Sequence, residues 1–214
     1  MNNIIEINYI IIGFTCLISF MAFNNPHWTY KLKHWPYQEV RDGEYYRWLT
    51  SGFLHGDAMH LIFNMMTLYF FGRIVEEWFT MTFPSFGQIF YLLFYLISIV
   101  AASSATFIKY KESPGFASIG ASGAVAAVLF ASILLLPTNK IYLFFIPIGI
   151  PGFIFGILYL WFSAYEAKRG GDNIDHTAHY YGAIFGFLFP IVFEPGLVPL
   201  FFRQLQDWFA SFGM

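Results

Sequence analysis

The sequence predicts an all-α integral membrane protein, built as a bundle of six membrane-spanning helices. Three observations support this prediction: 57% of the 214 residues are hydrophobic, 22% are aromatic and only 11% are charged. A soluble domain has about 25% charged residues, so this chain has too few to coat a water-exposed surface. Lipid is therefore the expected solvent for most side chains, and the same composition excludes intrinsic disorder.

The net charge and the cysteine count exclude two further classes. A net charge of −2 leaves no basic surface for nucleic acid, so we expect no nucleic-acid partner. Cys16 is the single cysteine, which excludes an internal disulfide and a zinc site built from cysteines.

Six apolar segments with few or no charges predict the six helices. They are 7–22, 61–72, 88–107, 118–136, 141–165 and 178–193. Most approach the roughly 20 residues that a helix needs to cross the hydrocarbon layer. The second reaches this length only if it is extended to 58–75, and a short loop is then predicted at 76–87. The first is interpreted as a retained span, because a basic region before it and an A-x-A-like cleavage site after it are both missing.

The longest polar connection, 24–57, is rich in Trp and Tyr. Amphipathic rings favour headgroup depth, so this first loop is predicted to lie on the membrane surface rather than form a separate domain. Residues 195–214 are predicted as a short interfacial tail, with a helix within 201–214. The whole chain, 1–214, is thus expected to be one membrane domain.

Polar side chains at the N-terminal ends of three helices are the candidate functional residues, because a polar group within a span is costly without a partner. His60 and Asn64 share one face of the second helix. Ser122 begins the fourth helix within a Gly-Ala-Ser-Gly motif, and His179 begins the sixth. Helices separated by one span run parallel, so these four side chains are expected at one membrane face.

This arrangement suits a Ser–His nucleophile pair with side-chain donors for an oxyanion. Small residues let the two helices approach closely enough for a hydrogen bond between Ser122 and His179. These residues are Gly120, Gly123, Gly182 and Gly186. Each feature alone is explained by helix capping or packing. Because all of these features lie at one membrane face, we favour the interpretation that they form a catalytic site.

Two other kinds of site compete with this interpretation. Imidazoles are ligands for zinc or iron, and the chain offers four near the same face, namely His55, His60, His176 and His179. An HExxH motif and an intramembrane carboxylate are missing, so we expect no metal and no cofactor. A transporter or channel is the non-enzyme alternative, since polar groups on facing helices can line a permeation path.

Several sequence blocks, in the same order, resemble those of the rhomboid intramembrane serine proteases of the six-span bacterial type. They are YRWLTSGFLHGDAMHLIFN (46–64), GRIVE (72–76), GASG (120–123) and AHYYGAIFG (178–186). The resemblance covers residues 45–190. It implies a rhomboid-like bundle, and a serine endopeptidase that cleaves single-span membrane proteins within the lipid bilayer.

The resemblance also implies a role for each matched residue. Ser122 is the expected nucleophile and His179 the general base. His60, Asn64 and the backbone N–H of Ser122 are the expected oxyanion hole. Three matched positions carry structural roles in the family, and they are Arg47, His55 and Glu76, with Tyr46 replacing a Trp before the arginine.

One departure concerns the general base. Many family members carry an aromatic residue one turn after the nucleophile that stacks on the catalytic imidazole, but this chain has Ala126 there. What orients His179 therefore stays open, with Tyr180 and Tyr181 as candidates.

The resemblance implies an inner-membrane protein with cytoplasmic termini and a site that faces the extracytoplasmic side. Loop lysines and arginines favour the reverse orientation, because they concentrate on the side where the even-numbered helices begin. That side carries Lys31, Lys33, Arg41, Arg47, Lys109, Lys111, Lys168 and Arg169, against Arg73, Lys140 and Arg203 on the other. We keep the family topology as the expectation.

Overall fold

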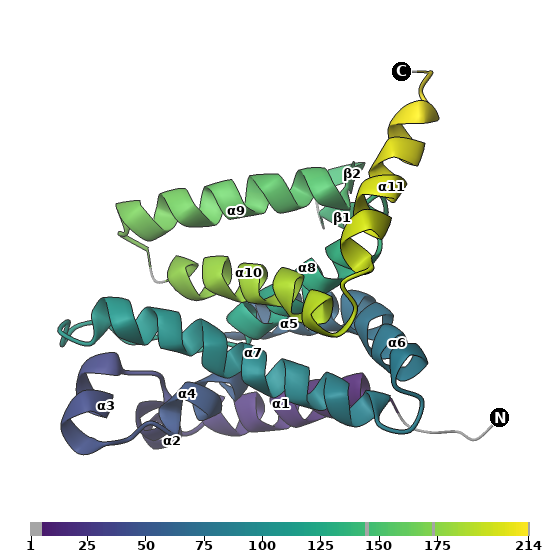
Figure 1. Ribbon diagram of the computed structural model, residues 1–214. Helices are drawn as coiled ribbons and strands as arrows, with labels where there is room; N and C mark the ends of the chain where they lie inside the picture. Colours follow the sequence, from purple (N-terminus) through teal and green to yellow (C-terminus); the bar gives the residue numbers. More distant parts are fainter. Residues whose placement is uncertain (1–5, 144–145, 173, 214) are drawn as a thin grey trace.

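A computed structural model describes residues 6–143, 146–172 and 174–213. The bundle consists of α1 (Ile7–Phe23), α5 (Ala58–Thr67), α6 (Arg73–Thr82), α7 (Gly87–Tyr110), α8 (Ser122–Leu135), α9 (Gly152–Arg169) and α10 (His176–Phe193). Its two ends carry α2 (Pro26–Leu32), α3 (Pro36–Asp42), α4 (Arg47–Thr50) and α11 (Leu197–Ala210). Figure 1 shows α2, α3 and α4 together at one end and α6 and α11 at the other.

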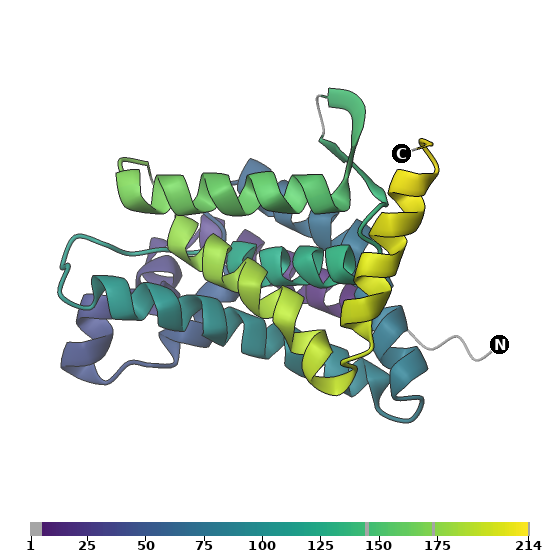
Figure 2. The same ribbon diagram turned by 45° about the horizontal axis from the view of Figure 1, so that its top comes forward.

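Helix α8 forms the core of the bundle. Every residue of α8 except Ser122 is buried, and apart from Ser132 these buried residues are apolar on all faces of the helix, as expected of a central helix. In both Figure 1 and Figure 2, α8 lies between the flanking helices, and it begins at the end where α10 also begins. The predicted all-α membrane bundle is confirmed.

The second helix is longer than predicted. Helix α5, the π-helical turn η2 (Leu68–Gly72) and α6 form one continuous run of 25 residues, Ala58–Thr82. The prediction that a loop begins at Glu76 is therefore wrong. Glu76 is buried within the helix, where its carboxylate accepts hydrogen bonds from the backbone N–H groups of Ile7 (2.7 Å) and Asn8 (3.0 Å). These donors at the start of α1 stabilise the charge that sequence reasoning had assigned to a loop.

The fifth segment is corrected as well. Helix α9 begins at Gly152, not at residue 141, and an antiparallel hairpin precedes it, formed by β1 (Lys140–Leu143) and β2 (Ile146–Pro151). Strand β2 contains Pro147 and ends at Pro151. A proline in a helix interior loses a hydrogen bond and clashes with the preceding turn, so this apolar stretch forms a strand. Hydropathy alone does not separate a short buried strand from a helix.

Length and composition select two helices of the described chain as able to cross a membrane, Ala58–Thr82 and Gly87–Tyr110. The pair α10 and α11, bent by 112°, adds a third if counted as one span. Helices α1 and α8 are apolar but shorter. Six spans therefore remain a prediction. The tail helix lies at 197–210, four residues earlier than the predicted start at 201.

The first loop is folded into α2, α3, α4 and the 3-10 turn η1 (Ser51–Phe53). Its centre is the fully buried Glu39, which accepts hydrogen bonds from the ring of His34 (2.7 Å) and from the indole N–H of Trp48 (2.9 Å). Arg47 is buried too, and donates to Glu44 (2.7 Å) and to the carbonyl of Tyr30 (2.8 Å). Hydrogen bonds to the buried carboxylate of Glu39 and from the buried guanidinium of Arg47 thus hold this loop together.

Candidate active site

Ser122 and His179 are in contact. Nε2 of His179 lies 2.7 Å from Oγ of Ser122, a hydrogen-bond distance between side chains 57 residues apart in the chain. Ser122 is the first residue of α8, and His179 lies in the first turn of α10. Both side chains are half-buried. A hydroxyl bonded to an imidazole in this way can lose its proton to the ring as it attacks a substrate.

The shortness of α8 determines the depth of Ser122. Helix α8 has 14 residues, about 21 Å at 1.5 Å per residue, which is less than the hydrocarbon thickness. The chain reaches it from the end of α7 through residues 111–121, which form no helix. Gly123, next to Ser122, lies against Ala102, about two turns before the end of α7, so α8 begins inside the bundle. Non-helical backbone at such a depth is tolerated where it lines a polar cavity.

Gly120 leaves room for the imidazole of His60 near Ser122. A Cβ at Gly120 would lie 2.7 Å from Cε1 of His60, 2.9 Å from its Nε2 and 3.7 Å from Oγ of Ser122. Gly120 also has φ = +137°, a conformation that other residues rarely adopt. The glycine is thus needed for two reasons, and the imidazole of His60 occupies the space beside Ser122.

Asn64 lies one turn after His60 on the same helix and is buried. Its Nδ2 donates to the carbonyl oxygen of His60 at 2.8 Å. An amide nitrogen has two hydrogens, so this bond leaves one of them for another acceptor. His60 and Ser122 thus both lie beside Gly120, and Asn64 is bonded to the backbone of His60.

Backbone N–H groups provide a further set of donors. The first N–H groups of a helix lack partners within it, and they attract negative charge. The residue before α8, Ala121, has no side-chain acceptor that could cap them. The N–H groups at the start of α8 are consequently suited to stabilise an anion beside Ser122.

Close packing of α8 and α10 keeps Ser122 and His179 next to each other. A Cβ at Gly182 would lie 2.9 Å from the carbonyl carbon of Gly123, and one at Gly186 would collide with the backbone of Ala127. A Cβ at Gly123 would in turn collide with Ala102 of α7 and lie 3.3 Å from the carbonyl oxygen of Ala178. Of the four predicted small residues, Gly182 and Gly186 thus lie against the backbone of α8, Gly123 lies against α7 and α10, and Gly120 lies against the imidazole of His60.

Asp175 is a site residue that sequence reasoning missed. It is the N-cap of α10, and its carboxylate accepts from the backbone N–H of Ala178 (2.9 Å), the hydroxyl of Thr106 (2.9 Å) and the hydroxyl of Ser118 (3.0 Å). It thereby ties the start of α10 to α7 and to the segment before Ser122. The sequence does contain a signal for this role, because an Asp directly before a helix commonly caps the helix by accepting from an N–H three residues later.

A small polar cavity of about 30 Å³ borders Ser122, room for about one water molecule. Its lining includes the side chains of Ser118, Asp175 and His34. Nε2 of His34 is buried and has no hydrogen-bond partner among the described residues. His34 was not among the predicted site residues, because nothing in the local sequence joins it to residue 122.

The rings beside His179 are not those expected. Tyr180 and Tyr181 contact each other, with ring centroids 5.3 Å apart. The imidazole of His179 instead lies near Tyr159 of α9 (6.4 Å between centroids) and His176 of α10 (5.7 Å).

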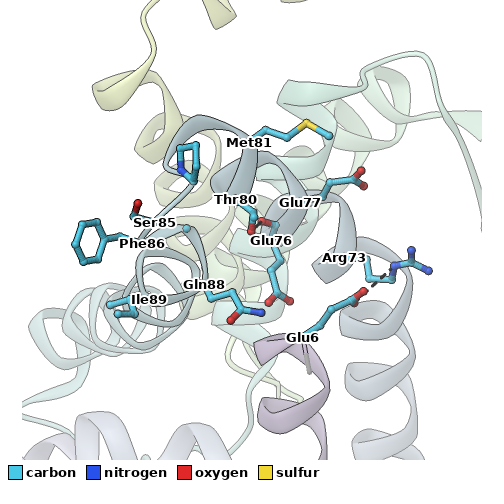
Figure 3. A pocket seen from close by; sticks show the side chains of 12 residues that line it. Glu6, Arg73, Glu76, Glu77, Thr80, Met81, Ser85, Phe86, Gln88 and Ile89 are labelled. Carbon is cyan, nitrogen blue, oxygen red and sulfur yellow. Dashed lines mark hydrogen bonds and ion pairs between the residues drawn. The ribbon is translucent and has the colours of Figure 1, made fainter. Parts of the chain in front are cut away.

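A larger cavity lies elsewhere. A pocket of about 600 Å³ is lined by residues of α6 and by Gly87 and Gln88 at the start of α7, while the cavity beside Ser122 adjoins the other half of α7. Figure 3 shows Glu76 between the two flanking side chains of this pocket, Arg73 and Gln88, with Glu6 paired to Arg73. This pocket is therefore separate from the Ser–His pair.

The metal site considered as an alternative from the sequence is only partly matched by the structure. Among the described residues, one group could hold a metal ion, with ligand atoms of Glu166, Asp172 and His176 within 4.8 Å of one another. Nε2 of His176 is hydrogen-bonded to Asp172 (2.9 Å), and this bond lowers the pKa of the Asp172 carboxyl. The group does not include His55, His60 or His179, whose rings lie in other contacts.

Comparison with known proteins decides the family. Residues 42–195 match the Rhomboid domain, which is most of the chain. The chain belongs to the rhomboid family. The matched range extends a few residues beyond both ends of the resemblance found in the sequence, 45–190.

Three relatives place this rhomboid chain among named proteins. It is 32% identical over 158 residues to the RHOMBOID-like protein 12, mitochondrial, of Arabidopsis thaliana, covering 67% of this chain and 45% of that protein. It is 26% identical over 162 residues to the Rhomboid protease GlpG of Haemophilus influenzae, covering 75% and 76%. It is 32% identical over 148 residues to the Rhomboid protease GluP of Bacillus subtilis, covering 69% and 26%. The chain thus spans less than half the length of two of these relatives.

Proposed function

We propose that this rhomboid chain is an intramembrane serine endopeptidase that uses a Ser122–His179 dyad. The observation that carries the proposal is the 2.7 Å hydrogen bond between Nε2 of His179 and Oγ of Ser122 at the uncapped start of a buried helix. Membership of a family whose named relatives include two rhomboid proteases adds to it.

The first half of the reaction forms an acyl-enzyme. Nε2 of His179 accepts the proton of Ser122 as Oγ attacks the carbonyl carbon of a substrate peptide bond. The negative charge that develops on the carbonyl oxygen is stabilised by the N–H of Ser122, the imidazole of His60 and the free amide hydrogen of Asn64. His179 then gives its proton to the leaving amine, the peptide C–N bond breaks, and the acyl group remains on Ser122.

The second half hydrolyses the ester. A water molecule gives a proton to His179 while its oxygen attacks the acyl carbon, and the Ser122 oxygen leaves with that proton. The polar cavity that adjoins Ser122 gives water a place next to the acyl carbon in an otherwise apolar bundle. We propose a dyad rather than a triad with a carboxylate, because burying that additional charge in the bundle would be costly.

The substrate class follows from the depth of Ser122. A peptide bond reaches a nucleophile inside the bundle when the substrate is itself a membrane protein with a single span. An intact helix has its carbonyl groups bonded internally, so the segment near the cut has to unwind. Glycine or proline near that bond therefore aids cleavage, and replacing them with alanine or leucine slows it.

Purified protein reconstituted with a single-span substrate tests this function. Wild type is expected to release two fragments, and Ser122→Ala to release none. Ser132→Ala is the matched control, because Ser132 is a buried serine of the same helix that bonds to the carbonyl of Leu129, and it should retain cleavage. Continued cleavage by Ser122→Ala contradicts the proposal.

We further propose the family topology, with the site on the extracytoplasmic face of a bacterial inner membrane. In a Cys16→Ser background, cysteine replaces the exposed Lys111 at the site end or the exposed Asp207 at the other end. An impermeant maleimide added to intact cells should label the first variant and not the second. The opposite pattern contradicts this orientation and agrees with the lysine and arginine distribution.

A further inference from the structure

The general base has an aromatic neighbour from a helix that carries no part of the dyad. The ring of Tyr159 on α9 lies 6.4 Å from the imidazole of His179 between centroids, with an angle of 32° between their planes. This is within the 4.5–7 Å range of attractive aromatic pairs. The second neighbour, His176, meets His179 edge-on at 81°. Of the two neighbouring rings, that of Tyr159 is therefore the nearer to parallel with the imidazole of His179.

The small side chain at Ala126 makes room for this contact. Ala126 is buried in the apolar cluster against which Tyr159 packs. Its position is one helical turn after Ser122 on α8, so a large side chain there would enter the space between α8, α9 and α10. Because alanine leaves that space open, a ring from α9 can reach the imidazole.

Two further rings hold Tyr159 in place. Phe130, one turn after Ala126 on α8, lies 5.5 Å from it, and Phe155, one turn earlier on α9, lies 5.9 Å from it. Phe130 is buried. Tyr159 is thus fixed from both helices, and its position relative to His179 is determined by packing.

The imidazole needs such a contact. Among the described residues, the hydrogen bond of the His179 ring is the one to Ser122, and no carboxylate is bonded to its other nitrogen. In a triad that carboxylate holds the ring in the correct orientation. Here the backbone of α10 and the neighbouring rings have to do so.

We infer that Tyr159 is the positioning residue of the general base, a ring supplied by α9 across the space left by Ala126. This inference rests on the proposed dyad function. It makes the reactivity of Ser122 depend on the contact between α9 and α10, because the ring that orients His179 belongs to α9. The aromatic ring, and not the hydroxyl, provides the contact.

Three variants test the inference by kinetics. Tyr159→Leu keeps an apolar side chain but removes the ring, Tyr159→Phe keeps the ring, and Leu160→Ala is a matched loss of packing against the same cluster. We expect Tyr159→Leu to lower kcat for a reconstituted single-span substrate about tenfold, the rate equivalent of one aromatic contact, with KM nearly unchanged. Tyr159→Phe should stay within about twofold of wild type, and Leu160→Ala should lower Tm without the tenfold loss.

The pH dependence of fluorophosphonate labelling separates positioning from general loosening. The midpoint of the labelling rate against pH reports the group that activates Ser122. It should move in Tyr159→Leu and stay at the wild-type value in Tyr159→Phe and Leu160→Ala. A second route is rescue, in which Ala126→Phe restores part of the kcat lost in Tyr159→Ala by supplying a ring from α8.

The possible failures are distinguishable. If wild type is labelled at Ser122 but Tyr159→Leu keeps the wild-type kcat and midpoint, or loses no more than Leu160→Ala, the inference about Tyr159 is overturned and the dyad stands. If folded wild type is not labelled at all, the dyad fails, and the positioning role fails with it.

Discussion

Replacing Gly182 with alanine should separate the two helices that carry Ser122 and His179. The added Cβ would lie 2.9 Å from the carbonyl carbon of Gly123, with the carbonyl oxygen nearer still, whereas ordinary contact begins at 3.4 Å. The contacted atoms are backbone, so they have no rotamer that relieves the clash. Helix α10 therefore has to move from α8 by on the order of 1 Å, a displacement that costs about 100-fold in a reaction needing aligned groups.

The same clash should lower stability. Overpacking of this kind costs about 1–3 kcal/mol, which is roughly 2–12 °C in Tm for a chain of this length. The displacement acts on a hydrogen bond of 2.7 Å, and lengthening that bond by 1 Å breaks it. Activity should thus fall further than the modest loss of stability alone explains.

The assay pairs the rate of fluorophosphonate labelling with a thermal melt in detergent. Gly13→Ala is the matched control, because Gly13 lies within α1 and nothing stands within 4 Å of its added Cβ. The control should match wild type in labelling and equal or exceed it in Tm. If Gly182→Ala also labels at the wild-type rate with an unchanged Tm, the close helix contact does not hold the dyad in place and the reasoning is refuted.

Three further predictions follow from other parts of the structure. Asn64→Ala should lower kcat about 100-fold or more with little change in KM, as expected for the loss of an oxyanion donor. The control is Thr67→Val, which loses a similar side-chain bond to its own helix and should stay near wild type. Equal activities of the two variants contradict the role of Asn64. Glu76→Ala should destabilise the protein by about 3 kcal/mol, because two backbone N–H groups at the start of α1, one of them buried, lose a charged acceptor. Glu77→Ala, at an exposed neighbour, should change the melt little, and similar losses in both variants argue against the α1 contact. His55→Asn should reduce the decrease in the free energy of unfolding that acid causes, measured by melts at pH 6.5 and 4.5. Burial lowers the pKa of the His55 ring from 6.5 to about 3, so below pH 6.5 the unfolded state binds the proton first and the folded state loses stability. Between pH 6.5, where the unfolded ring is half protonated, and pH 4.5, the wild type should lose about 2.3 kcal/mol more than the variant. Equal losses in both contradict a buried neutral ring.

From the sequence alone, the helical membrane class and the proximity of Ser122 and His179 could be predicted. A chain with 11% charged residues has few alternatives to a membrane bundle, and the parity of spans places Ser122 and His179 at the same end whatever the packing. The hydrogen bond between them needs close helices, and the glycines at 182 and 186 signal that closeness in the sequence.

Other features depend on contacts that leave no local signal. Tyr159 reads as one more apolar residue of a membrane helix until α9 is placed beside α10, and His34 reaches the cavity of Ser122 only through the fold of the first loop. The hairpin at 140–151 was missed because its apolar residues satisfy a hydropathy window, while Pro147 and Pro151 oppose a helix. Glu76 was assigned to a loop because its partners are backbone N–H groups, which sequence patterns do not reveal.

Mapping the covalent adduct of a fluorophosphonate probe tests the central claim most directly. The full chain in detergent is labelled, digested and analysed by mass spectrometry, alongside Ser122→Ala, His179→Ala and the buried-serine control Ser132→Ala. The Ser–His dyad predicts one modified residue, Ser122, in wild type and in Ser132→Ala, and no adduct in the two dyad variants. An adduct on another residue, or labelling that persists in His179→Ala at the wild-type rate, contradicts the claim that His179 activates Ser122.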